Sequence, residues 1–239
     1  MDNTPGQKFA SVFFQAYQNQ LFWLFILSFW IGPSSIAADH QTNALLVYLS
    51  KPLTKSDYLL GKWMGIFLTL FALAIFPALV LYVYCLLSYL DDGFLRDERW
   101  LLIRMLGATM IPGIVHASVH VGCSAWSKSP RMAGAVYAGL FLVTGFVSGA
   151  YWAIRYHGRL QDGIDIRHCS IGGVIQGLAQ NVFGVTMHMT RFSRRRQELL
   201  NLTLEPPSLR LMIALALALV VAGVVAARMR IRAVEVVRG

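Results

Sequence analysis

The sequence has little charge for its length. Of its 239 residues, 14% are charged and 56% are hydrophobic. A soluble globular domain carries about 25% charged residues, so this composition excludes an ordinary soluble domain and indicates a protein that lies in lipid. The formal net charge of +9 does not predict nucleic acid as a partner, because Lys and Arg beside membrane spans serve to fix their orientation.

Several familiar motifs are also missing. Three cysteines make no disulfide framework, and the first residues lack the basic stretch, short apolar core and cleavage site of a signal peptide. A phosphate-binding loop needs two glycines at fixed spacing before Lys and then Ser or Thr. Gly61-Lys62 is followed by Trp63, and Ser56 stands at the earlier glycine position. We therefore expect no ATPase activity, no catalytic residues and no cofactor in this chain.

Long apolar runs are what the sequence has instead. A helix needs about 20 mostly apolar residues to cross a bilayer, whereas barrel strands are shorter and alternate in polarity. The sequence therefore predicts an all-α integral membrane protein with one transmembrane domain over residues 1–239. We expect about five spans, at residues 13–37, 63–87, 101–126, 132–154 and 211–227.

Two features inside the spans affect helix packing. Pro77 interrupts the hydrogen bonding of the second span, which membrane helices tolerate when a neighbour satisfies the freed carbonyl. The fourth span contains Gly134, Gly139, Gly145 and Gly149. Small residues let helix backbones approach closely in lipid, so we expect close helix contacts along this span.

A long segment, 155–210, separates the last two predicted spans. Its uncharged middle has apolar residues at helical spacing: Ile171, Val174, Ile175, Leu178, Val182 and Val185. Gln176, Gln180 and Asn181 fall off that face. The pattern predicts an amphipathic helix that is interfacial or re-entrant, lying at the membrane surface or against other helices, in preference to a sixth span.

The distribution of basic residues predicts the topology. Five spans place the chain ends on opposite sides, and the basic residues of segment 38–62 share a side with the C-terminal arginines. We expect a protein of the cell inner membrane. Because positive charge favours the cytoplasm, its C-terminus should be cytoplasmic, and its N-terminus and segment 155–210 should be on the external side. The many arginines of that long segment run against this assignment, although charge in long loops has little influence on orientation.

Segment 38–62 predicts a compact helix, turn and helix at the cytoplasmic surface. Pro52 ends any helix near Leu49, and Ser56 or Asp57 is expected to cap the next helix. Composition alone leaves two interpretations open: a polar connector with snorkelling lysines, or a docking surface for a partner.

The stretch "SIAADHQTNALLVYLSKPLTKSDYLLGKWMGIF" resembles the ABC-2 type transporter permeases, in which an acidic residue, a small and apolar run, a basic residue with Pro and a Gly-Lys pair follow a span. The matching residues are Asp39, Ala44, Leu45, Leu46, Lys51, Pro52, Leu53, Thr54, Lys55, Gly61 and Lys62. Lys51 and Lys55 stand where Arg is more usual. The stretches "SAWSKSPRMAGAVYAGL" and "EPPSLRLMIALALALVVAGVVAARMRIRAVEVVR" resemble later parts of the same family.

This resemblance implies a permease subunit of an exporter. Two permease subunits would pair and recruit two cytoplasmic ABC ATP-binding subunits, which would hold ATP and Mg and press on segment 38–62. The expected coupling residues are Asp39, Lys51, Pro52, Lys55, Tyr58, Gly61 and Lys62. The family usually has six spans, and the motif aligns so that the first is missing here. We therefore expect either a truncated start or a five-span variant.

Two alternatives to an ATP-driven permease remain open. His116, His120 and Cys123 recur at i, i+4 and i+7. Imidazole and thiolate bind zinc or copper, so they suit a metal or drug carrier without an ATPase. The histidines can equally hydrogen-bond to neighbouring helices.

The second alternative is a membrane scaffold that docks a partner through segment 155–210 and transports nothing. A basic cluster in that segment is either a solvated face or a contact for lipid headgroups, with membrane lipid as a partner. Its members are Arg191, Arg194, Arg195 and Arg196.

Overall fold

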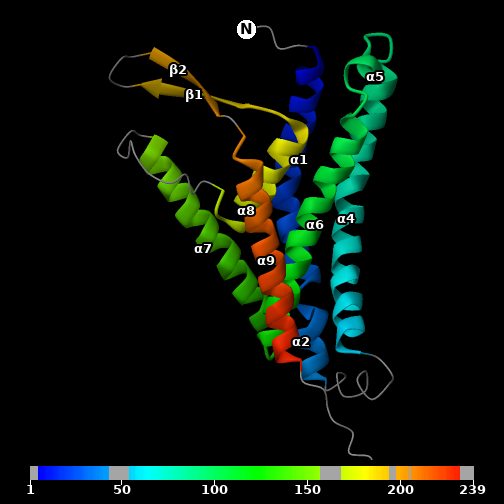
Figure 1. The fold of residues 1–239 in the computed structure, drawn as a ribbon, viewed down its shortest axis with the longest axis vertical. Helices are drawn as coiled ribbons and strands as arrows, with labels where there is room; N and C mark the ends of the chain where they lie inside the picture. The colour runs from blue at the N-terminus through cyan, green and yellow to red at the C-terminus, as the bar shows by residue number, and fades with distance from the viewer. Residues whose placement is uncertain (1–4, 43–53, 157–167, 194–197, 205, 232–239) are drawn as a thin grey trace, which may run out of the picture.

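The computed structural model describes residues 5–42, 54–156, 168–193, 198–204 and 206–231. Figure 1 shows an elongated bundle of long helices with a short hairpin at one end. The helices are α1 (Pro5–Ile31), α2 (Ser34–Gln41), α4 (Lys55–Ser88), α5 (Phe94–Asp97), α6 (Leu101–Trp126), α7 (Pro130–Tyr156), α8 (Ile171–Phe183) and α9 (Leu209–Arg230). The strands β1 (Met187–Ser193) and β2 (Glu198–Leu204) pair antiparallel.

Among the described residues, five stretches are helical, long and apolar enough to cross a membrane, as predicted. The first joins α1 and α2 over Phe9–Gln41, and the others are Lys55–Ser88, Leu101–Trp126, Pro130–Ile154 and Leu209–Arg230. An all-α integral membrane protein is thereby confirmed for the spanning part of the chain. The hairpin of β1 and β2 was not predicted.

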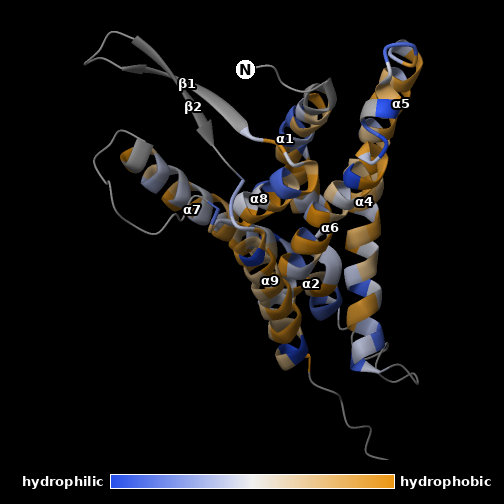
Figure 2. Ribbon diagram, turned by 45° about the horizontal axis from the view of Figure 1, so that its top comes forward, coloured by the Kyte–Doolittle hydropathy of each residue, from blue (hydrophilic) through white to orange (hydrophobic). Residues whose placement is uncertain are grey.

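The outer surfaces of the long helices are apolar. Trp30, Phe76 and Phe146 are 80%, 70% and 77% exposed. A soluble protein rarely exposes so many large apolar side chains together, so these surfaces suit contact with acyl chains. Figure 2 shows hydrophobic colours along the helices and hydrophilic colours at the ends of α4 and α9.

Helix α6 forms the centre of the bundle. It contacts α1, α2, α4, α7, α8 and α9, and most of its residues from Val115 to Ala125 are buried. A Cβ atom at Gly122 would lie 2.9 Å from the carbonyl oxygen of Gly223 in α9. The absence of side chains at both positions therefore lets α9 cross α6 closely.

Of the four glycines of α7 that were expected to lie in close helix contacts, one does so. A Cβ at Gly134 would lie 3.1 Å from the ring of Phe29, whereas Cβ atoms at Gly139, Gly145 and Gly149 would meet nothing within 4 Å. The expectation of close contacts along this span is wrong within this chain, because α7 leans away from the bundle beyond its first turns (Figure 1).

Helix α8 lies inside the bundle and does not span it. Its 13 residues give a length of about 20 Å, less than the roughly 30 Å of a bilayer core. It packs against α1, α6, α7 and α9, which favours the re-entrant form of the predicted helix. Gln180, which falls off the apolar face in the sequence, is nevertheless only 1% exposed, because several helices surround α8. Asn181 donates from Nδ2 to the carbonyl of Pro207, at 2.9 Å, and ties α8 to the start of α9.

Pro77 in α4 has the neighbour that the sequence analysis required. Proline leaves the carbonyl four residues earlier without its helical donor, and that carbonyl belongs to Leu73. The amide Nε2 of Gln20 in α1 lies 3.2 Å from the Leu73 oxygen and 2.8 Å from the Ala74 oxygen. A side chain from α1 thus satisfies the break in α4.

Candidate functional site

The first span breaks at Gly32 and Pro33, between α1 and α2. Pro33 stands at the N-cap of α2 and makes no side-chain cap hydrogen bond. Ser124 of α6 supplies the cap instead: its Oγ accepts from the N–H groups of Ile36 and Ala37, at 3.0 and 2.8 Å, and donates to the Pro33 carbonyl at 2.8 Å. Because a helix needs partners for its first N–H groups, these bonds fix α2 against α6.

Helix α4 begins with a capping box. Thr54 is the N-cap, its Oγ1 accepts from the Asp57 N–H at 3.2 Å, and its own N–H donates to Asp57 Oδ2 at 3.1 Å. The prediction that Ser56 or Asp57 is the N-cap was therefore wrong. The helix starts earlier because Thr54 and Asp57 satisfy each other's backbone donors.

The ends of α2 and α4 meet at a charged cluster, Asp39, Tyr58 and Lys62. The hydroxyl of Tyr58 donates to Asp39 Oδ2 at 2.6 Å, and Lys62 Nζ lies 2.6 Å from the same oxygen. Asp39 is 9% exposed, so water screens this contact less than it screens a surface ion pair. Hydrogen bonds to a charged group are among the stronger ones, and here they join segments on either side of residues 43–53.

The predicted coupling residues have different outcomes in the structure. Asp39, Tyr58 and Lys62 are brought together in the charged cluster. Lys55 is the first residue of α4, and a Cβ at Gly61 would have nothing within 4 Å. Lys51 and Pro52 lie outside the described residues.

A second, neutral cluster lies deeper in the bundle, around Tyr137 of α7. Its hydroxyl is 2.7 Å from His116 Nδ1 and 2.9 Å from Ser28 Oγ. The three residues come from α7, α6 and α1 and are all buried. His116 thus bonds to a neighbouring helix, which is one of the two interpretations that the sequence left open for it.

His120 packs into this neutral cluster. Its ring centre is 3.7 Å from that of Tyr137, and its two ring nitrogens have no hydrogen-bond partner among the described residues. A Cβ at Gly32 would overlap the His120 ring. The break between α1 and α2 therefore needs glycine at this position so that the imidazole can lie against the backbone.

The metal hypothesis gains no support from this geometry. Within the described part of the chain, no three His, Cys, Asp or Glu side chains gather closely enough to hold a metal ion. Cys123 is buried as a free thiol, and the Nδ1 of His116 is engaged by Tyr137.

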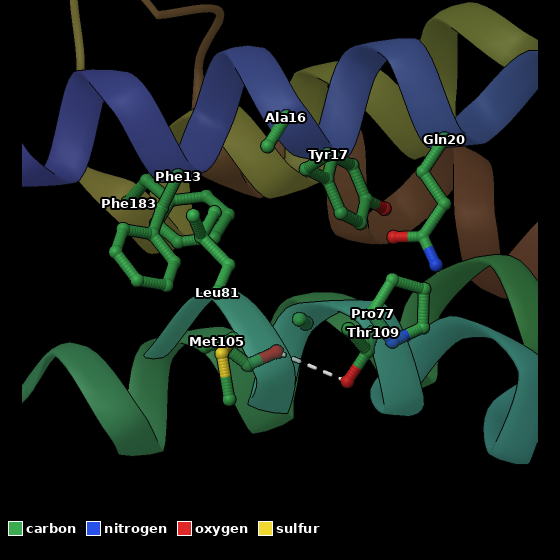
Figure 3. A pocket seen from close by; sticks show the side chains of 10 residues that line it. Phe13, Ala16, Tyr17, Gln20, Pro77, Leu81, Met105, Thr109 and Phe183 are labelled. Atoms are coloured by element: carbon green, nitrogen blue, oxygen red, sulfur yellow. Dashed lines mark hydrogen bonds between the residues drawn. The ribbon is translucent and has the colours of Figure 1, made fainter. Parts of the chain in front are cut away.

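A cavity of about 80 Å³ lies beside the Pro77 break, between α1, α4, α6 and α8. Figure 3 shows Tyr17 and Gln20 reaching from α1 toward Pro77. The Tyr17 hydroxyl is buried and has no partner among the described residues. The cavity has room for roughly two or three water molecules. Pockets for drug-sized ligands start near 300 Å³, so this cavity is too small for such a ligand.

The basic cluster lies largely beyond what the structure describes. Arg191 belongs to β1, and Arg194, Arg195 and Arg196 fall outside the described residues. Contact of these residues with lipid headgroups stays a prediction.

Sequence reasoning missed the residues that connect the clusters. Ser124 continues the four-residue spacing of His116 and His120 along α6, and this spacing could have marked one polar face. Gln20 gave no distinct signal, because Gln15, Gln18 and Asn19 stand in the same predicted span. Tyr137 gave no signal, because an isolated Tyr in an apolar run is ordinary.

Comparison with known proteins agrees with this architecture. A family model described as ABC-2 family transporter protein matches residues 11–229, which cover all five candidate spans nearly end to end. A search of curated proteins found no match.

Proposed function

Since the chain belongs to the ABC-2 transporter family, we propose that it is the membrane-spanning permease subunit of an ABC exporter. A separate cytoplasmic ATP-binding subunit would hold ATP and Mg and perform hydrolysis. The observation that carries this proposal is the charged cluster of Asp39, Tyr58 and Lys62. These three residues belong to the segment that resembles the family's coupling motif, and they meet at one end of the bundle.

The charged cluster suits the transmission of force. A partner that presses on residues 43–53 would act on both the end of α2 and the start of α4. Movement of α2 would pass to α6 through the three Ser124 hydrogen bonds. Movement of α4 would pass along about 33 Å of helix, from Lys55 to the break at Pro77. ATP-driven closure would thereby change how α4 and α6 stand against each other.

The proposed orientation follows the basic residues. Lys55 and Lys62 of α4 and Arg228 and Arg230 of α9 lie at the same end of the bundle as α2 (Figure 1). With positive charge on the cytoplasmic side, that end faces the ATP-binding subunit in the inner membrane. The N-terminus is then outside and the C-terminus is inside.

A second permease subunit is part of this proposal. Gly145 and Gly149 are exposed and four residues apart on α7, and Cβ atoms there would meet nothing within 4 Å. Small residues at this spacing are a common contact between membrane helices. The open side of α7 is thus a suitable place for the paired subunit.

The experiment is co-purification followed by an ATPase assay in lipid nanodiscs. The tagged chain, expressed with its native neighbours, should bring down a stoichiometric ATP-hydrolysing subunit. Charge reversal at Lys51 and Lys55 together should release that subunit, whereas Lys128→Glu, an exposed charge at the same end of the bundle, should not. If no ATPase accompanies the wild-type chain, the proposal is overturned.

The charged cluster is tested by exchanging its charges. Asp39→Asn should lower stimulation of the partner's ATPase at least about fivefold, since coupling free energies between sites are typically 1–3 kcal/mol. The double variant Asp39→Lys with Lys62→Asp should recover part of that loss, because it restores an opposite-charge pair. Full stimulation by Asp39→Asn would show that this pair plays no part in coupling.

A further inference from the structure

Helices α4 and α9 enclose a groove near the end of the bundle that carries α2. Both helices pack along α6, and a cavity of about 330 Å³ remains between them. Its walls are apolar: Leu59, Leu60 and Trp63 come from α4, and Val220 and Val224 come from α9. Ligand pockets start near 300 Å³, so this groove is large enough for one.

The groove is polar at one end only. Ser56 and Arg228 line it near the first residue of α4 and the last turn of α9. Between Val220 and Arg228 the helix rises about 12 Å, so the apolar wall runs from the polar end toward the membrane interior. The groove therefore has the polarity of an amphiphile whose headgroup lies at the membrane surface.

Arg228 supplies a positive charge that has no ion-pair partner among the described residues. Neither of the two ion pairs found among the described residues involves it. Three neighbouring charges are engaged elsewhere: Lys62 pairs with Asp39, Asp57 closes the cap of α4, and Arg230 lies 5.6 Å from the centre of the Trp126 ring. A guanidinium can bind a phosphate with two hydrogen bonds, and the nearby start of a long helix also favours an anion.

We propose that this groove is a binding site for one anionic phospholipid. An acyl chain lies between Leu60, Trp63 and Val224, and the phosphate lies at Arg228 and Ser56. An uncharged helix of a second copy fits less well, because it would cover the guanidinium of Arg228 without supplying an anion.

The lipid would support the part of α4 that carries the charged cluster. Leu59 and Leu60 line the groove beside Tyr58, and Trp63 follows Lys62. The Trp63 indole is fixed against α6, because its N–H donates to Ser118 Oγ at 2.8 Å. This regulatory consequence rests on the proposed function, whereas lipid binding itself does not require an ATP-binding partner.

Native mass spectrometry of the full chain tests the binding site. The chain is released from vesicles of phosphatidylglycerol mixed with phosphatidylcholine, and retained lipids are counted. We expect one tightly retained phosphatidylglycerol per chain. Arg228→Gln should lower that retention about fivefold, corresponding to the loss of one basic residue at the membrane surface. The matched control Arg230→Gln removes a charge outside the groove and should retain the lipid.

Filling the groove is the second arm. Val224→Trp should prevent retention, whereas Val221→Trp, on an exposed position of the same helix that does not line the groove, should not. Equal loss with both arginine variants would mean general surface attraction and would overturn the proposal. Retention of phosphatidylcholine as strong as that of phosphatidylglycerol would do the same. If Val224→Trp abolished dimers instead of lipid retention, the groove would be an interface between copies.

Discussion

The charged cluster and the neutral cluster are built on the same plan in different surroundings. In each, one tyrosine hydroxyl joins separate helices: Tyr58 reaches Asp39, and Tyr137 reaches His116 and Ser28. The charged cluster lies at the end of the bundle, where Lys62 is 28% exposed, whereas His116 is 1% exposed inside it. Ionised groups are expensive within a membrane, so the chain keeps its ion pair at the edge and uses uncharged partners inside.

The difference separates two roles for polar groups. The neutral cluster joins α1, α6 and α7 and holds the bundle together, because an interior hydrogen bond has no water to replace its partner. The charged cluster can exchange its partners with water or with another protein. It is therefore the better place for a contact that breaks and reforms.

The largest expected effect comes from Gly32→Ala, which would disrupt packing in the neutral cluster. The new Cβ would overlap the His120 ring, and overpacking of this kind costs about 3 kcal/mol. The melting temperature in detergent should fall sharply. Gly139→Ala, at a position with open space, is the control and should change little.

A rescue variant keeps this prediction falsifiable. Adding His120→Ala to Gly32→Ala should restore much of the stability, because the ring is what the new methyl group meets. A Gly32→Ala protein as stable as the Gly139→Ala protein would show that the histidine does not rest on the α1–α2 break.

A smaller effect is expected from Ser124→Ala, which disconnects the two clusters. The variant removes the cap of α2 and leaves the buried N–H groups of Ile36 and Ala37 without their acceptor. Loss of a helix cap costs about 1–2 kcal/mol, so the melting temperature should fall by several degrees. The control is Ser127→Ala, which removes a hydrogen bond to the Cys123 carbonyl of the same segment. If its melting temperature fell as far as that of Ser124→Ala, the capping role would be contradicted.

The smallest and most discriminating effects come from comparing Tyr137→Phe with Tyr58→Phe. Each removes one hydroxyl, and a hydrogen bond contributes about 1 kcal/mol. Tyr137→Phe should lower the melting temperature and leave stimulation of the partner's ATPase intact. Tyr58→Phe should lower the stimulation and change the melting temperature less. The opposite pattern would reverse the roles given to the two clusters.

The sequence predicted the spans well because hydropathy alone decides them. The third span, 101–126, coincides with Leu101–Trp126 of the structure. The helix of the second span was expected to begin after a cap at Ser56 or Asp57 and begins at Lys55, because the capping box of Thr54 and Asp57 is not visible to a hydropathy argument. The hairpin was missed because its strands interrupt a segment judged only for helical spacing.

The candidate site was predicted only in part, because a sequence motif marks some of its residues and tertiary contacts decide the others. Asp39, Tyr58 and Lys62 were chosen because the motif resembles a known family, and the structure brings them together. Ser124 and Gln20 were not chosen, because their value depends on which helix lies opposite. Such tertiary partners cannot be read from the spacing of residues within one helix.

Gln20 and Pro77 depend on each other: Pro77 breaks the hydrogen bonding of α4, and Gln20 supplies a donor at the break. The proline removes a donor from α4, and the amide of α1 restores one to Leu73 or Ala74. Because the amide reaches two neighbouring carbonyls, α4 can bend slightly without losing its partner. A related chain that replaced Pro77 with an ordinary residue would restore the helical donor of Leu73, and the amide at position 20 would keep only its bond to the Ala74 carbonyl. We therefore expect positions 20 and 77 to change together among related chains.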